Sequence, residues 1–126
     1  MNQYRRIYIA GPLTPRSDDQ NHAVEYLGNC RQMFRAWLEL AGAGWHPFCP
    51  AVDFVFFFLS DGLNENLVKE NSLAWLEATE AIVLLPGWEN SFGAKAEFEL
   101  AVKLGKKVFY SIEEANKWLK KEVGNE

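Results

Sequence analysis

The sequence lacks the features that would mark a secreted, membrane-spanning or metal-binding chain. It has two cysteines, Cys30 and Cys49, with no CxxC pair and no His or Cys cluster around them, so neither a disulfide framework nor a zinc site is predicted. The longest apolar run, residues 54–59, has six residues, far fewer than the ~20 of a membrane span. The N-terminal apolar run, residues 7–10, is too short for a signal peptide. We therefore expect a cytoplasmic protein with reduced thiols and no membrane contact.

Positive charge is scarce as well. The chain has 13 Lys and Arg against 17 Asp and Glu, a net charge of −4. Proteins that bind a nucleic-acid backbone normally carry a basic surface, so no nucleic-acid partner is predicted. Small phosphorylated ligands remain compatible, because one local cluster of donors can hold them. The Walker pattern GxxxxGK[ST] and the dinucleotide pattern GxGxxG are both missing, which argues against ordinary NTP or dinucleotide binding.

Apolar side chains, by contrast, are plentiful. They make up 48% of the 126 residues, and 14% of the chain is aromatic. That content suffices for a packed core in one domain of this size without a disulfide or metal. No linker, repeat or low-complexity tract divides the chain, so residues 1–126 are predicted to form a single domain.

Short apolar segments alternate with amphipathic ones. Strands are predicted at residues 6–10, 45–48, 81–85 and 106–110, and helices at 64–79, 93–104 and 112–123. A further helix is expected between a cap at Asp18 or Asp19 and the glycines from Gly42, with an apolar stripe formed by Ala23, Tyr26, Leu27, Cys30, Met33, Phe34, Trp37, Leu38 and Ala41. The candidate buried positions of helix 64–79 are Leu67, Leu73, Trp75, Leu76 and Ala78. The segment 51–59 is predicted to be irregular or partly helical.

Polar residues at element ends have expected roles too. Ser111 and Glu114 have capping-box spacing at the start of the last helix. Glu80, directly before the apolar strand 81–85, is expected to have a structural role between helix and strand.

This alternation predicts an α/β fold with a doubly wound parallel sheet of four to five strands and helices on both faces, in three layers. The apolar strand 81–85 is expected to be central, because both of its faces would be buried. Ligands of such sheets bind beyond the carboxyl ends of the strands. The loops at residues 11–17 and 86–93 are therefore the places to look for a site.

The loop before residue 93 and the helix after it contain candidate catalytic and substrate-binding residues. Ser91 precedes a helix whose free N–H groups and positive dipole end suit a phosphate, and Gly93 allows close approach to the backbone. Glu97 lies about one helical turn further on and can point toward the loop mouth. Trp88 is either a stacking surface for a base or a plug between subunits. The alternative is that Ser91 is only an N-cap and Glu97 only a solvated first-turn acid.

The loop after the first strand begins with the candidate substrate-binding residues Gly11 and Pro12. It supplies hydroxyls, backbone donors and a guanidinium at Arg16, which can form a fork onto a phosphate. Arg16 is equally well read as a surface arginine. Tyr8, two residues before this loop, is either a core aromatic or a hydroxyl that orients a carboxylate.

Taken together, three blocks resemble the nucleoside 2-deoxyribosyltransferase superfamily, including its 2'-deoxynucleoside 5'-phosphate N-hydrolases. They are IYIAGP at residues 7–12, AIVLL at 81–85 followed by SxGxxxE at 91–97, and AxxLGK at 101–106. Their order and spacing match the family over most of residues 6–109. The resemblance implies a flavodoxin-like fold, no metal or organic cofactor, and a homodimer or larger homo-oligomer whose neighbouring subunit completes the pocket.

The resemblance also implies residue roles. Glu97 aligns with the glutamate that attacks C1' of the sugar, and Tyr8 with the tyrosine that orients it. The transferases have aspartates where this chain has Ser72 and Ser91. A serine at the second position is typical of the N-hydrolases, where it contacts the 5'-phosphate. What replaces the aspartate at Ser72 in handling the proton of the base, Asn71, Glu70 or the substrate itself, stays open.

From these residues we expect the cleavage or exchange of the N-glycosidic bond of a (deoxy)nucleoside or, more readily, its 5'-monophosphate. The alternative is a non-catalytic module that senses or sequesters nucleotides on the same fold. The aromatic residues 54–58 and Trp75 are candidates for the subunit interface, with core packing as the other interpretation.

Overall fold

The structure, a computed structural model, describes residues 4–13, 21–53 and 65–124. Its centre is a parallel sheet, in the order β2-β1-β3-β4 within these ranges. The strands are β1 (Arg6–Ala10), β2 (His46–Phe48), β3 (Ala81–Leu84) and β4 (Lys107–Phe109). The apolar strand β3 is fully buried and central, as predicted. Pro47 lies in β2 at the edge of the sheet, where a missing N–H costs no ladder bond.

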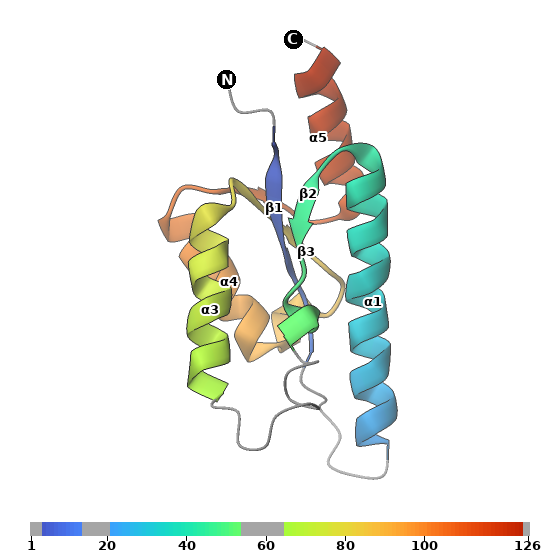
Figure 1. The fold of residues 1–126 in the computed structure, drawn as a ribbon, viewed down its shortest axis with the longest axis vertical. Coiled ribbons are helices and arrows are strands. Elements are labelled where there is room, and N and C mark those ends of the chain that lie inside the picture. Colours follow the sequence, from blue (N-terminus) through green and yellow to red (C-terminus); the bar gives the residue numbers. More distant parts are fainter. Residues whose placement is uncertain (1–3, 14–20, 54–64, 125–126) are drawn as a thin grey trace.

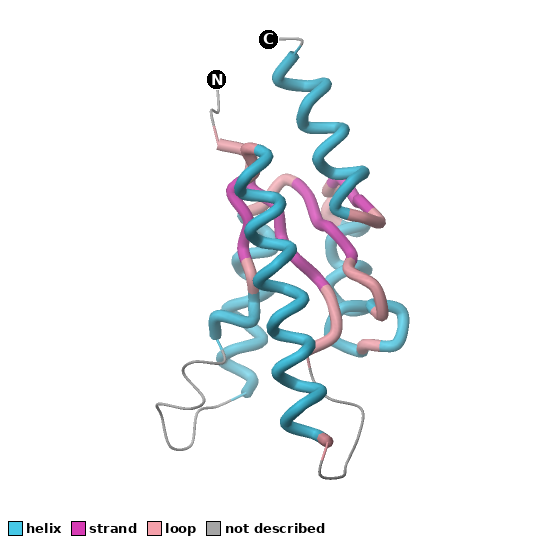
Figure 2. The backbone as a smooth tube through the Cα atoms, turned by 90° about the vertical axis from the view of Figure 1, so that its right-hand side faces the viewer, coloured by secondary structure: helices cyan, strands magenta, loops and turns pink. Residues whose placement is uncertain are grey.

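Helices cover both faces of the sheet (Figures 1 and 2). They are α1 (His22–Ala43), α3 (Glu65–Ala78), α4 (Phe92–Lys103) and α5 (Ile112–Gly124). In Figure 1, α1 and α5 lie on one side of the strands, and α3 and α4 lie on the other. Two 3₁₀ turns, η1 (Pro50–Asp53) and η2 (Trp88–Asn90), follow β2 and β3. The fold is therefore the predicted three-layer α/β fold of the Rossmann-like and flavodoxin-like type.

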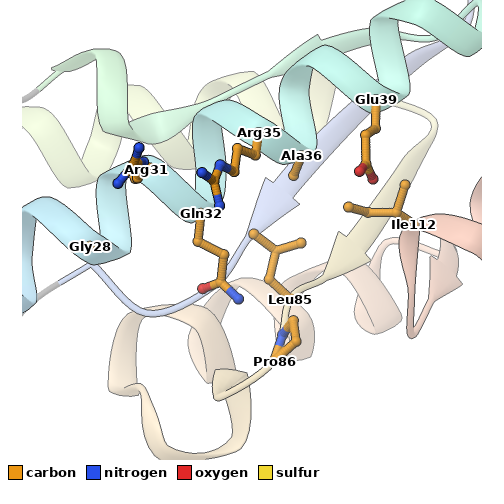
Figure 3. A pocket seen from close by; sticks show the side chains of 9 residues that line it. All are labelled: Gly28, Arg31, Gln32, Arg35, Ala36, Glu39, Leu85, Pro86 and Ile112. Carbon is orange, nitrogen blue, oxygen red and sulfur yellow. The ribbon is translucent and has the colours of Figure 1, made fainter.

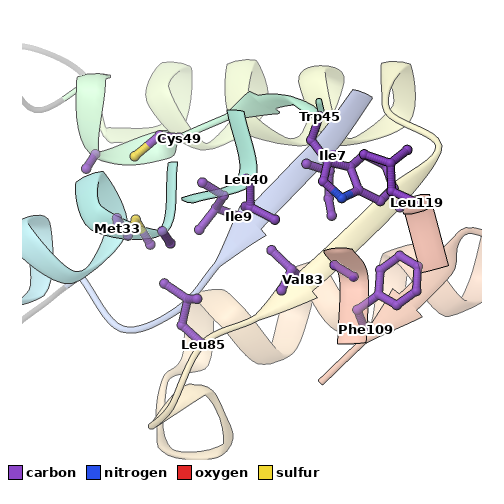
Figure 4. Close-up of a cluster of buried hydrophobic side chains, with 14 residues drawn as sticks. Ile7, Ile9, Met33, Leu40, Trp45, Cys49, Val83, Leu85, Phe109 and Leu119 are labelled. Atoms are coloured by element: carbon purple, nitrogen blue, oxygen red, sulfur yellow. The ribbon is translucent and has the colours of Figure 1, made fainter. Parts of the chain in front are cut away.

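The alternation of side chains along β1 separates two cores. Ile7 and Ile9 belong to the cluster beneath α1 and α5 (Figure 4), whereas Tyr8 and Ala10 belong to the cluster beneath α3 and α4. Successive residues of a strand point to opposite faces, and all four of these side chains are fully buried. Tyr8 therefore faces the same layer as α4, the helix that carries the predicted site residues.

The first helix buries a narrower face than the sequence pattern predicts. Met33, Ala36 and Leu40 face the sheet and are at most 1% exposed. Several members of the predicted stripe are exposed instead: Ala23, Leu27, Phe34, Trp37 and Leu38. Apolar residues occur on two sides of α1, so steps of three and four fit either side, and only packing against the sheet decides between them.

The prediction for α3 needs a similar correction. Leu76 is buried as expected, but the other four candidates are exposed, namely Leu67, Leu73, Trp75 and Ala78. The buried positions next to Leu76 are the polar Ser72 and Thr79. A search for apolar periodicity passes over polar residues, and for this reason it placed the buried face on the wrong side of the helix.

Three polar contacts stabilise the element ends. The Ser111 hydroxyl accepts the Glu114 N–H at 3.1 Å, and the Glu114 carboxylate accepts the Tyr110 N–H at 3.2 Å. The predicted capping box is thus present, with Tyr110 in place of the usual N-cap N–H. Glu80 accepts the Arg6 N–H at 3.1 Å, which is the expected structural role. In α1 the N-cap is Asn21, and not the predicted Asp18 or Asp19, which lie outside the described residues.

The loops after β1 and β3 meet at the carboxyl end of the sheet. A Cβ atom added at Gly11 would lie 3.0 Å from Cβ of Leu85, and one added at Gly87 would lie 3.3 Å from Pro12 Cγ. Gly87 also has φ 90°, a conformation that favours glycine. The two predicted site loops are therefore in direct contact.

This contact generates a prediction about stability. Gly11→Ala forces a methyl group against the Leu85 side chain and should lower the free energy of unfolding by about 1–3 kcal/mol. The matched control is Gly28→Ala in α1, where an added Cβ meets nothing within 4 Å. That change should raise the free energy of unfolding by about 0.5–1 kcal/mol. Urea unfolding of the three proteins tests this, and two changes of the same sign would contradict it.

Candidate active site

The structure brings Tyr8 and Glu97 together at the sheet. The Tyr8 hydroxyl donates a hydrogen bond to Oε2 of Glu97, across 89 residues of sequence. Glu97 lies three residues after Ala94 and four before Ala101, both buried against the sheet. Residues at these spacings share one helix face, so α4 turns the carboxylate inward. The geometry therefore favours the orienting hydroxyl among the two interpretations of Tyr8, and it excludes a fully solvated Glu97.

A column of aromatic rings holds the phenol. The ring of Tyr8 stacks on Phe48 with centroids 5.5 Å apart, and Phe48 stacks on Trp75 at 5.4 Å. Tyr8 is fully buried, whereas Trp75 is 47% exposed. Parallel pairing places Phe48 of β2 opposite Tyr8 of β1. The phenol is thus fixed from the side by packing and at its hydroxyl by the carboxylate.

The carboxyl group of Glu97 is electrostatically unusual. Burial raises its pKa from 4.5 to about 7, while the hydrogen bond from Tyr8 acts in the lowering direction. Desolvation disfavours the charged form, and a donor to the carboxylate favours it. Near neutral pH the group therefore populates both its neutral and its ionised form, a property typical of carboxyl groups that take part in chemistry.

The N-terminus of α4 lies a turn before Glu97. Ser91 has extended backbone angles, and its hydroxyl accepts the Ala94 N–H at 3.2 Å, so Ser91 is the N-cap. A capping hydroxyl still has a proton to donate. Phe92 and Gly93 occupy the first two helical positions, where N–H groups have no partner within a helix. A Cβ added at Gly93 would meet nothing within 4 Å, so this backbone is accessible to a ligand.

The remaining predicted residues divide into three groups. Ser72 is 8% exposed and lies one turn from Leu76, which belongs to the same buried cluster as Tyr8. Trp88 packs against Phe98 at 4.9 Å and Tyr110 at 6.4 Å, within its own chain and toward the β4 edge. These contacts show neither of the two roles predicted for Trp88, which are to stack on a base and to fill the surface between subunits. Arg16 and the aromatic residues 54–58 lie outside the described residues.

Sequence reasoning missed the part that Phe48 and Trp75 play beside Tyr8. The sequence pattern predicts Phe48 only as the end of a strand, and Trp75 as a core or interface residue. The pairing of residue 8 with residue 48 depends on strand register, for which the sequence carries no local signal. Asn71 and Glu70, the alternatives for handling the base proton, are both exposed on α3.

The described ranges contain no group of three or more His, Cys, Asp or Glu side chains that could hold a metal ion. None of the helices seen in those ranges is long and apolar enough to cross a bilayer.

The raised pKa of Glu97 generates a second prediction. A carboxyl group whose pKa is higher in the folded than in the unfolded chain makes the fold less stable as pH rises through that interval, here from about 4.5 to about 7. Glu97→Gln has no charge to bury. Compared with the wild type it should be clearly more stable near about pH 8.5 and nearly equal near about pH 4, below the interval in which the two pKa values differ.

Urea unfolding of both proteins at these two pH values measures the effect. The control for loss of one negative charge is Glu99→Gln, at an exposed position of the same helix. A stability difference between wild type and Glu97→Gln that is the same at both pH values would show that folding does not desolvate this carboxylate.

Comparison with known families shows a match over most of the chain. Residues 5–110, most of the chain, match the model of a family described as "Domain of unknown function (DUF4406)". No curated protein matches the sequence. Because this match covers more than half of the chain, the chain belongs to the DUF4406 family.

Proposed function

We propose that this protein cleaves or exchanges the N-glycosidic bond of a (deoxy)nucleoside 5'-monophosphate, or of the nucleoside, with Glu97 as the nucleophile. The observation that carries the proposal is the hydrogen bond from Tyr8 to Glu97 at a site next to an open helix N-terminus. An oriented, partly desolvated carboxylate is what a retaining glycosyl transfer requires. The resemblance of residues 7–12, 81–85 and 91–97 to the nucleoside 2-deoxyribosyltransferase superfamily supports the same chemistry.

The proposed reaction has two displacements at C1' of the sugar. In the first, a Glu97 carboxylate oxygen bonds to C1' as the C1'–N bond breaks, and the base leaves with that electron pair and takes up a proton. In the second, water or another base attacks C1', gives up a proton to solvent and releases the carboxylate, giving hydrolysis or exchange. This proton balances the one that the departing base takes up in the first step. Both steps pass through an oxocarbenium-like sugar. Tyr8 holds one carboxylate oxygen in place while the other reacts.

The N-terminus of α4 favours a phosphorylated substrate. The first-turn N–H groups and the positive end of the helix dipole attract anions, and the Ser91 hydroxyl has a proton left to donate. A carboxylate at that position would repel a phosphate, and a hydroxyl does not. The open space at Gly93 admits the phosphate to the backbone.

The serine at position 72 affects how the leaving base is protonated in this mechanism. A serine hydroxyl is too weak an acid to do the work of an aspartate, and Asn71 and Glu70 point to solvent from α3. Within the described chain this leaves the substrate as the best candidate among the three alternatives. Bases that leave readily without enzymatic protonation should therefore be the better substrates.

A second function is a module that binds nucleotides without turning them over. The observation in its favour is that Ser72 and Ser91 stand where the resembling transferases have aspartates. Such a module would keep the anion site at α4 but would not use Glu97 as a nucleophile.

The decisive measurement is chromatography of free base released from nucleosides and 5'-monophosphates, each with and without an acceptor base. We expect release by the wild type and none by Glu97→Gln. The rate should rise with pH through about 7, because only the ionised carboxylate attacks. Dependence on the acceptor base would identify exchange, and release without it hydrolysis.

Tyr8→Phe is the matched variant for this experiment, since it keeps the ring stack on Phe48 and removes only the hydroxyl. Loss of that donor raises the pKa of Glu97 further, so the pH midpoint of base release should move upward. An unchanged midpoint would show that Tyr8 does not act on the carboxylate. Binding of a panel member without base release from any protein would support the non-catalytic module.

We further propose that the protein forms a homodimer in the cytoplasm. Leu27, Phe34 and Leu38 are 44–65% exposed on α1. At about 100° per residue they point away from the buried side of the helix. A helix with apolar residues on two sides is typically packed against protein on both of those sides. The exposed Trp75 on α3 is a further candidate, and the free thiols of Cys30 and Cys49 fit a reducing compartment.

Light scattering at micromolar concentration tests the dimer. The wild type should have twice the chain mass. Leu38→Glu should be monomeric, because it places a charge in the apolar interface. The Leu38 side chain is 65% exposed in the single chain, so this change should leave the core of the monomer intact. Val123→Glu on α5, where the side chain is 57% exposed, is the control and should remain dimeric. A monomeric wild type would refute the proposal.

A further inference from the structure

A cavity of about 340 Å³ lies on the face of the sheet opposite to Tyr8 and Glu97. It opens between α1 and the segment that follows β3 (Figure 3). Its floor is apolar, formed by Ala36, Leu85, Pro86 and Ile112. Ala36 and Leu85 belong to the core cluster beneath α1 and α5, so this cavity is separate from the site proposed above.

One end of the cavity is positively charged. Arg31, Gln32 and Arg35 line it from consecutive turns of α1 (Figure 3). Among the described residues neither arginine forms an ion pair, the observed pair being Arg5 with Glu80. Arg31 and Arg35 are four residues apart, so their side chains leave the helix on the same side. Two guanidinium groups beside one amide can instead form several charge-assisted hydrogen bonds to a phosphate.

The other end is negatively charged. Glu39 lines the cavity beside Ile112 (Figure 3), and it too has no ion-pair partner in the described part of the chain. At 1.5 Å per residue, Glu39 lies about 9 Å along the helix from the midpoint of the two arginines. A carboxylate at this place can accept hydrogen bonds from an amino group.

We propose that this cavity is a second ligand site, for a nucleoside monophosphate whose base carries an amino group. The phosphate binds to Arg31, Arg35 and the Gln32 amide, and the base amino group donates to Glu39. The flat body of the nucleotide lies over Leu85, Pro86 and Ile112. Such a molecule has an anion, an apolar body and a hydrogen-bond donor in that order. The cavity presents arginines, apolar side chains and a carboxylate in the same order. The assignment does not depend on any reaction at Glu97.

The test is a titration of ¹⁵N-labelled protein with adenosine 5'-monophosphate, followed by NMR. The side-chain amide of Gln32 and the backbone amide of Ile112 report on this cavity, whereas the amides of Ser91 and Gly93 report on the α4 site. We expect the first pair of signals to move in the wild type and in Glu97→Gln alike. Failure of the glycosidase proposal would therefore leave this result unaffected.

Two double variants assign the contacts. R31Q/R35Q keeps helix-forming side chains of similar length. The Kd obtained from the shifts at Gln32 and Ile112 should be at least about tenfold higher in this variant than in the wild type. K117Q/K120Q removes two exposed charges from α5 and should leave Kd unchanged. Equal affinity in R31Q/R35Q and wild type would overturn the proposal. So would shifts confined to Ser91 and Gly93, or no shift at roughly 10 mM ligand.

Ligand comparisons on the unaltered chain make the test independent of how well the variants fold. Adenosine, which lacks the phosphate, should bind at least about tenfold more weakly than the monophosphate. Inosine 5'-monophosphate, with a carbonyl in place of the amino group, should also bind more weakly, and Glu39→Gln should abolish that difference. Equal binding of inorganic phosphate and the nucleotide would show an adventitious anion contact and reject the site.

Discussion

The parallel pairing of β1 with β3 is the interaction on which the rest of the molecule depends. Their register places Tyr8 beside Ile82 and Ala10 beside Leu84, and all four side chains are buried. Because both strands are covered on both faces, a shift of one residue would exchange the two cores and turn the Tyr8 phenol away from α4. The same pairing brings the loops after the two strands into contact. Core packing and the geometry of the candidate active site thus have a single origin.

The candidate site combines two opposing demands on Glu97. The nucleophile that we propose has to be ionised, yet burial against the sheet favours the neutral acid. The phenol of Tyr8 compensates in part by donating to the carboxylate. The resulting pKa near neutrality keeps a reactive fraction of carboxylate while limiting the cost of a buried charge. In the proposed reaction, stability and reactivity are therefore balanced at one carboxyl group.

Much of the fold could be predicted from the sequence, because its signals are local. The apolar run at 81–85 indicated a central strand, and the Ser111 to Glu114 spacing indicated a helix start. The rotation of α1 and α3 could not be predicted, since Leu27 and Met33 fit helical periodicity equally well and the polar Ser72 is buried. Only the position of each helix against the sheet decides between such faces.

For the site, the spacing of Ser91, Gly93 and Glu97 was sufficient to locate α4 and its cap. The neighbours of Tyr8 were not predictable, because Phe48 reaches it through strand register and Trp75 through helix packing. Likewise the cavity beside Arg31 and Arg35 depends on how α1 crosses the end of β3. Contacts between elements distant in sequence leave no short pattern to find.

The aromatic column from Tyr8 through Phe48 to Trp75 connects the interior to the solvent. Stacked rings are stiff and close-packed, so a tilt at one end of such a column is transmitted to the other. The orientation of a fully buried phenol is consequently linked to an indole that is half open to the outside. A side chain on the surface of α3 is thereby coupled, through Phe48, to the hydroxyl that orients the Glu97 carboxylate.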